Sequence, residues 1–108
     1  MRIKKFLLVL IFFLSNTQIL FADEAKMTKG LLIFNETAGC AACHVLKAAG
    51  SEGNIGPNLD TVEGLNYDSV MDIVTHGLGV MPAFGEDEIL TKEEIDIVSF
   101  YVANSVGK

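Results

Sequence analysis

The chain has 108 residues, half of them hydrophobic, with a formal net charge of −6 and only two cysteines. No basic patch is present to neutralise phosphates, which excludes a nucleic-acid-binding protein. Neither a repeat nor a low-complexity tract nor a long linker divides the sequence, so we expect one domain.

The N-terminal segment has the organisation of a secretory signal peptide. Three basic residues precede an unbroken apolar run at 6–14 and a polar segment at 15–18. Small Ala22 suits the residue before the cut, so the sequence predicts a signal peptide at 1–22 and a mature domain at 23–108. An uncleaved anchor is the alternative, but the apolar run is about half of the roughly 20 residues that a spanning helix requires.

Cleavage would concentrate the negative charge of the chain. Five basic and all fourteen acidic residues follow Ala22, so the mature net charge is −9. We expect a protein partner with a basic docking face, no nucleic acid and no membrane span in the mature chain. Export would place the protein in the periplasm or an equivalent extracytoplasmic space.

The first mature helix is predicted over Met27 to Glu36. Apolar Met27, Leu31 and Phe34 recur at helical spacing, and two acidic residues at 23–24 stand ahead of the expected start. Gly39 then turns the chain.

The next five residues carry the chemistry of the chain. Cys40 and Cys43 enclose two alanines and are followed directly by His44, which is the attachment signature of c-type haem. The two thiols add to the haem vinyl groups, and the adjacent imidazole reaches the iron. A redox dithiol expects a surrounding βαβ pattern and a zinc site needs four ligands, and neither context is present. The motif therefore predicts one haem c on Cys40 and Cys43 with His44 as an iron ligand, which leaves no cysteine for a disulfide.

Two further helices follow. The glycine-rich segment at 48–59 is expected to be an irregular loop against the cofactor. Apolar spacing predicts a helix from Tyr67 to Thr75, ended by His76 and Gly77. Thr91 as N-cap with Glu94 three residues on begins the last helix, to about Ala103. A hydrophobic staple is expected between Leu90 and Ile95, and no strand pattern competes with these helices.

A low-spin electron carrier needs a second axial ligand, and Met81 is the best candidate. Pro82 forces Met81 out of helical geometry, and the neighbouring glycines let the backbone approach a ring. Met27 and Met71 lie among apolar helical residues and are interpreted as core. His76 is the alternative ligand, although a histidine that ends a helix usually contacts carbonyls or solvent.

These motifs together resemble class I cytochrome c. The heme-binding motif is followed by Gly-Pro-Asn-Leu at 56–59 and Met-Pro-Ala-Phe-Gly at 81–85, in the order and spacing of the small bacterial monohaem members. The resemblance implies an all-α cytochrome c fold, with three main helices packed around one covalently attached haem. It also implies that the first and last helices cross, with Gly30 and Phe34 meeting Tyr101.

The resemblance assigns two further residues to the cofactor. The backbone carbonyl of Pro57 is expected to accept a hydrogen bond from His44 and so to fix the imidazole. Leu59 is expected to pack on the haem. The chain has no tryptophan and is short between Leu59 and Met81, which favours a bacterial-type domain with one haem edge open to solvent.

The sequence therefore predicts a monomeric one-electron carrier and not an enzyme. A haem subunit of a larger oxidoreductase complex is the alternative, and a sensor or peroxidase would need an open sixth position on iron. The acidic residues at 86–88 are interpreted as a solvated turn before the last helix, with a docking role as the alternative.

Overall fold

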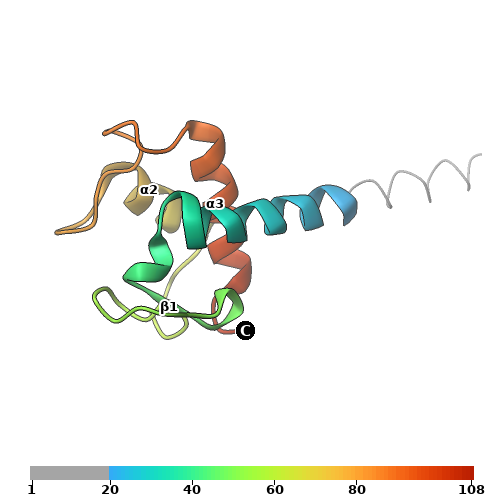
Figure 1. Ribbon diagram of the computed structural model, residues 1–108, viewed down its shortest axis with the longest axis horizontal. Coiled ribbons are helices and arrows are strands. Elements are labelled where there is room, and N and C mark those ends of the chain that lie inside the picture. The colour runs from blue at the N-terminus through green and yellow to red at the C-terminus, as the bar shows by residue number, and fades with distance from the viewer. Residues whose placement is uncertain (1–19) are drawn as a thin grey trace, which may run out of the picture.

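A computed structural model of the protein describes residues 20–108. The first helix, residues 20–32, continues without a break into a π-helical turn, η1, and protrudes from the rest of the molecule (Figure 1). The remaining elements are η2 (Cys40–Ala42), β1 (Val45–Leu46), η3 (Lys47–Ala49), β2 (Ser51–Glu52), α2 (Tyr67–His76) and α3 (Lys92–Ser105), with η1 at Ile33–Thr37. The molecule is thus mostly helical, as predicted. The predicted signal peptide lies outside the described residues except for 20–22, which belong to the first helix.

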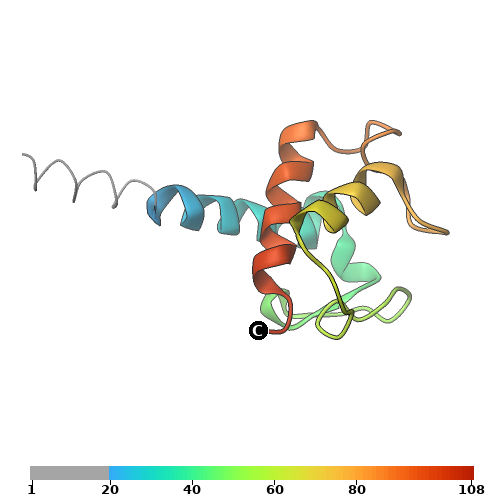
Figure 2. The same ribbon diagram turned by 180° about the vertical axis from the view of Figure 1, so that it is seen from behind.

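The first helix crosses α3 at close range (Figure 2). A Cβ atom built on Gly30 would lie 2.3 Å from the Tyr101 Cβ and 3.2 Å from the Ile97 carbonyl oxygen. Phe34 is 1% exposed, and its ring centroid lies 6.0 Å from that of Tyr101. The predicted contact of Gly30 and Phe34 with Tyr101 is confirmed, and it depends on the missing side chain at position 30.

The predicted start of the first helix was wrong. The helix begins by residue 20, so the acidic residues 23–24 lie within it and not ahead of it. Residues 20–26 contain no glycine or proline and several strong helix formers, so the helix extends beyond the part that packs. At the other end, Ala38 N–H donates to the Ile33 carbonyl at 2.9 Å, which widens the last turn into η1. The spacing of apolar residues therefore predicted only the part of the first helix that packs against the core.

Side-chain caps begin both later helices. The Thr91 hydroxyl accepts from Glu94 N–H at 3.1 Å, and the Glu94 carboxylate accepts from Thr91 N–H at 3.0 Å, so the predicted cap of α3 is confirmed. α3 ends two residues later than predicted, and α2 includes His76. Asn66 and Ser69 form an equivalent capping box for α2.

The prediction of no strand was wrong at one place. β1 and β2 form an antiparallel pair in which Val45 lies opposite Glu52 and Leu46 opposite Ser51. The Ser51 hydroxyl accepts from Leu46 N–H at 2.9 Å and is itself buried. Strands of two residues are too short to show an alternating pattern in the sequence. The segment predicted as an irregular loop therefore contains β2 and part of η3.

One hydrophobic core unites these elements. It includes both Leu90 and Ile95, as the expected staple requires. The buried members are Ile33, Phe34, Leu46, Val70, Val74, Phe84, Leu90, Ile95, Ile97, Val98, Tyr101 and Val102.

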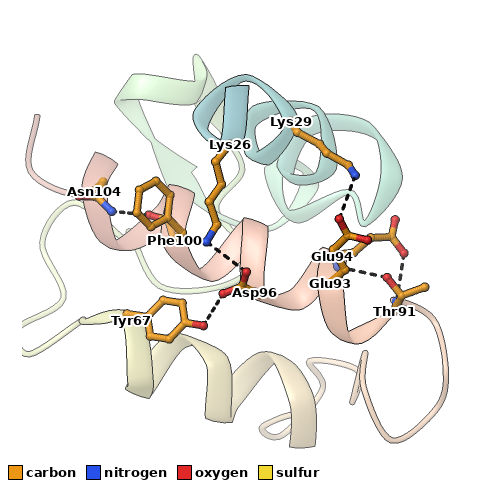
Figure 3. A network of polar contacts seen from close by, with 9 residues as sticks. All are labelled: Lys26, Lys29, Tyr67, Thr91, Glu93, Glu94, Asp96, Phe100 and Asn104. Atoms are coloured by element: carbon orange, nitrogen blue, oxygen red, sulfur yellow. Dashed lines mark hydrogen bonds and ion pairs between the residues drawn. The ribbon is translucent and has the colours of Figure 1, made fainter. Parts of the chain in front are cut away.

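A polar network joins the three helices at their edges (Figure 3). Lys26 of the first helix lies 3.1 Å from the Asp96 carboxylate and 4.6 Å from the centre of the Phe100 ring, both on α3. The Tyr67 hydroxyl of α2 donates to the other oxygen of Asp96 at 2.5 Å. This bond lowers the pKa of Asp96, with a smaller effect from Lys26, and raises the pKa of Tyr67 to about 12. Asp96 is therefore ionised and Tyr67 protonated at neutral pH.

Candidate haem site

The cysteine motif lies on one tight turn directly after η1. Gly39 adopts a left-handed conformation with φ 69°, which redirects the chain into η2. Cys43 and His44 each donate a backbone hydrogen bond to the Cys40 carbonyl, at 3.1 and 3.0 Å. The turn therefore fixes the backbone spacing of the two cysteines and the histidine, and neither cysteine is in a disulfide.

The His44 ring is oriented by the loop that follows β2. Its Nδ1 lies 2.7 Å from the Pro57 carbonyl oxygen. Because a carbonyl can only accept, Nδ1 carries the proton and Nε2 is the nitrogen with a free lone pair. The predicted hydrogen bond between His44 and Pro57 is present.

Glycine at position 56 lets the backbone lie against the same ring. A Cβ atom built there would lie 2.5 Å from His44 Cε1 and 2.9 Å from Nδ1. Any side chain at Gly56 would thus push the imidazole away from the Pro57 carbonyl. Gly56 N–H also donates to the Cys43 carbonyl at 2.8 Å, which holds the loop against the motif.

The cysteine motif is not part of a recognisable metal-ion site in the described part of the chain. Burial raises the pKa of the Cys40 thiol to about 11, so it is protonated at neutral pH. Zinc binding uses thiolates and further ligands. Within residues 20–108, no group of three or more histidine, cysteine or acidic side chains is arranged to hold a metal ion.

Leu59 and Met81 come from different segments but pack against the same core. Leu59 N–H donates to the Val45 carbonyl at 3.0 Å, which ties the segment after Pro57 to β1. Both side chains are partly buried against the common hydrophobic cluster, as is Cys40.

Met81 lies on a loop that leaves the end of α2 and returns to it. Leu78 and Met81 exchange backbone hydrogen bonds at 3.0 and 3.3 Å, which closes a tight turn. At the base, Phe84 N–H donates to the Val74 carbonyl at 2.9 Å, and the next two amides donate to Thr75. In Figure 1 this loop and the segment that contains the cysteine motif lie at the end of the molecule away from the protruding helix.

His76 is held by carboxylates. Its Nδ1 lies 2.6 Å from a Glu86 oxygen and its Nε2 lies 3.6 Å from an Asp72 oxygen. The hydrogen bond with Glu86 raises the pKa of His76, and the negative charges of Glu86 and Asp72 act in the same direction. Both ring nitrogens therefore face acidic groups, and Glu86 is part of an ion pair instead of a free acidic rim.

The residues of the site fit a covalently attached c-type haem. Cys40 and Cys43 are free, the side chains between them are small, and the fixed His44 ring has one nitrogen available for iron. The missing side chain at Gly56 leaves room for that ring beside the backbone.

Comparison with known proteins agrees with this geometry. A family model described as cytochrome c oxidase, cbb3-type, subunit III matches residues 25–102. The chain belongs to this family of c-type cytochromes. Among solved structures, the c-type cytochrome SorU from Sinorhizobium meliloti is 44% identical, with a TM-score of 0.70, over 79% of this chain and 95% of that one. A search of the curated proteins finds no match.

The chain is therefore a small monohaem class I cytochrome c, with the all-α fold that the sequence predicted. A c-type cytochrome carries covalent haem and exchanges electrons with redox partners. No helix within residues 20–108 of this cytochrome is long and apolar enough to cross a membrane.

Sequence reasoning missed two polar residues of this region. Asp60 accepts hydrogen bonds from the backbone amides of Lys47 and Gly107, and Glu86 binds His76. Asp60 directly follows the Gly-Pro-Asn-Leu segment, where an acidic residue near a sharp turn is a signal for capping backbone amides. Glu86 had no comparable signal, because no neighbouring residue in the sequence indicates that its side chain binds His76.

Proposed function

We propose that this cytochrome is an exported one-electron carrier whose single haem is bound through Cys40 and Cys43, with His44 and Met81 as the iron ligands. The haem, when bound, supplies a reversible couple between ferrous and ferric iron. Its leader at 1–22 would be removed, leaving the domain at 23–108 in the periplasm or an equivalent compartment.

The hydrogen bond from His44 to the Pro57 carbonyl carries this proposal. It fixes the tautomer of the imidazole, leaves Nε2 for iron and limits rotation of the ring. An electron carrier benefits from such rigid ligands, because little then has to reorganise when the iron changes oxidation state.

Met81 is favoured over His76 as the second ligand by the surroundings of the two side chains. Each nitrogen of His76 faces a carboxylate, and binding iron would cost the ring at least one of these contacts. The Met81 thioether carries no charge and lies on a loop closed by five backbone hydrogen bonds. A methionine ligand places the potential in the positive part of the range that axial ligands span.

Charge defines the kind of partner. The mature net charge of −9 favours encounter with a basic docking face and a short-lived complex, and both effects weaken with salt. Asp87 and Glu88 are exposed beside the Met81 loop, whereas Glu86 is engaged by His76.

The attachment is tested by the mass of the exported protein after complete denaturation. We expect haem to remain on the wild-type chain, and we expect the Cys40→Ser, Cys43→Ser double variant to lose it because no thiol is left. A matched control, Glu52→Gln, changes an exposed side chain in the same region and should keep the attached haem. A wild-type chain that releases its haem on denaturation would contradict the proposal.

A second candidate function is supported by the family match. The description of the matching family names a subunit of an oxidase. The alternative function is therefore that of a permanent haem subunit, which passes electrons within one complex. Mild purification of the tagged protein from its native cells separates the two roles. A free carrier elutes at the size of the monomer, and a subunit elutes with a partner in fixed ratio.

A further inference from the structure

Four successive contacts join the loop at 56–60 to the segment at 43–47. The first two are the bonds of Gly56 with Cys43 and of Pro57 with His44, at 2.8 and 2.7 Å. Next along the loop, Leu59 N–H donates to the Val45 carbonyl at 3.0 Å. In the fourth contact, Lys47 N–H donates to the Asp60 carboxylate at 2.8 Å. The acceptor in each of the other three contacts is a backbone carbonyl.

Asp60 also reaches the C-terminal end of the described chain. Its second carboxylate oxygen accepts from Gly107 N–H at 2.9 Å, just after α3 ends. Its own N–H donates to the Asn58 side chain at 2.9 Å. The amide of Lys47 and then that of Gly107 lower the pKa of Asp60, so the carboxylate is ionised at neutral pH. One side chain thus joins the haem-motif segment, the Pro57 loop and the turn that follows α3.

We propose that Asp60 is a positioning residue for the His44 imidazole, acting through the Pro57 carbonyl. The proposal rests on the proposed function of His44 as an iron ligand. The Pro57 carbonyl lies between two anchored points, Gly56 before it and Leu59 with Asp60 after it. Releasing the Asp60 anchor leaves the Leu59 N–H alone to hold that side of the loop, and the hydrogen bond to His44 then lengthens.

The chemical consequence follows from the role of this hydrogen bond. A strong acceptor at Nδ1 makes the imidazole a better electron donor to iron, which favours the ferric state. A weaker bond therefore raises the reduction potential. It also exposes the Nδ1 proton to exchange with water.

Three substitutions separate hydrogen bonding from charge. Asp60→Ala removes both acceptor oxygens, and Asp60→Asn keeps one carbonyl oxygen for one of the two amides. Glu63→Gln removes the same charge from an exposed position three residues after Asp60 and is the matched control.

The main readout is the solvent exchange of the His44 Nδ1 proton, followed by NMR in the ferrous holoprotein. We expect exchange about tenfold faster in Asp60→Ala, a smaller increase in Asp60→Asn and no change in Glu63→Gln. The reduction potential should rise in the same order, beyond the charge effect seen in Glu63→Gln. If Asp60→Ala does not fold, the comparison of Asp60→Asn with Glu63→Gln decides the question.

The outcomes are distinct. A lower unfolding midpoint with an unchanged His44 proton in the folded Asp60 variants would overturn the positioning role and leave a purely structural one. A wild-type holoprotein without haem-coordinated His44 would overturn the proposed function, and the role of Asp60 with it. Faster exchange of the His44 Nδ1 proton in the Asp60 variants, with no change in Glu63→Gln, supports the proposal.

Discussion

Two contacts near the proposed iron ligands differ in their chemistry. Pro57 acts on His44 through a backbone carbonyl, whereas His76 and Glu86 close the base of the Met81 loop through an ion pair. The first contact pairs an imidazole with an uncharged backbone carbonyl. The second depends on the charge of an imidazole.

This ion pair predicts a pH dependence of stability. Because Glu86 raises the pKa of His76 above its ordinary 6.5, the folded state binds the proton more tightly than the unfolded state. The stabilisation is complete below the unfolded pKa and is lost as the pH rises through the folded pKa. We therefore expect the stability difference between wild type and His76→Gln to be largest at mildly acidic pH and to fall through neutral pH.

Chemical denaturation of the holoprotein at a series of pH values measures this difference. The Glu86→Gln variant should lose most of this pH dependence, because Glu86 raises the pKa of His76 more than the second contact, Asp72, does. A wild-type advantage that stays constant from mildly acidic to mildly alkaline pH would show that the ion pair does not stabilise the fold.

The polar residues of the site were the hardest to predict. Cys40, Cys43 and His44 lie within five residues and form a recognisable motif. Met81 was proposed as a ligand because Pro82 and several glycines surround it. The bonds of Asp60 and Glu86 join residues at least ten positions apart and have no periodic trace in the sequence. The hydrogen bond between His44 and Pro57 also spans thirteen positions, and it was predicted only because the motifs resemble class I cytochrome c.

At the scale of elements, the crossing of the first helix with α3 sets the frame of the molecule. Contact at Gly30 is closer than any side chain permits, so the two helices meet through backbone and the Tyr101 side chain. The network around Asp96 then fixes the relative rotation of the helices at another edge.

We predict that Gly30→Ala destabilises the protein, although alanine is the better helix former. The helix propensity gain is about 1 kcal/mol, but the new Cβ would overlap Tyr101 and force the helices apart, which costs about 1–3 kcal/mol in overpacked interiors and more where backbone must move. Urea unfolding of the holoprotein measures the change.

Lys29→Ala is the matched control on the same helix. Lys29 lies beside Gly30, is exposed and forms only a long ion pair with Glu93 at 3.9 Å, so its replacement should change stability by less than about 1 kcal/mol. An unfolding midpoint for Gly30→Ala at or above that of wild type would contradict the prediction. It would show that the first helix and α3 can move apart at position 30 without loss of stability.

Element boundaries followed local signals where these existed. Thr91 and Glu94 lie three residues apart and predicted the start of α3 correctly. The start of the first helix lacked such a signal, because its exposed portion follows helix propensity alone. The β1 and β2 pair depends on Ser51 bonding Leu46, a contact of one side chain that composition does not reveal.

At the scale of the whole molecule, the chain is an acidic helical domain built around one redox site. The hydrophobic residues at 59 and 81 are only partly buried against the core. A covalently held haem would add apolar contact to these side chains. The cofactor was predictable from the Cys-x-x-Cys-His motif, and the fold class was predictable from the resemblance to class I cytochrome c. The partner could not be predicted, because it lies outside the chain.

The central claim is that His44 and Met81 both bind the iron, and the absorption spectrum of the ferric holoprotein tests it most directly. We predict the weak red band of methionine sulfur bound to ferric haem in the wild type, its loss in Met81→Ala and its retention in the control His76→Gln. A wild-type spectrum without this band, or its loss in His76→Gln with retention in Met81→Ala, would contradict the assignment of Met81.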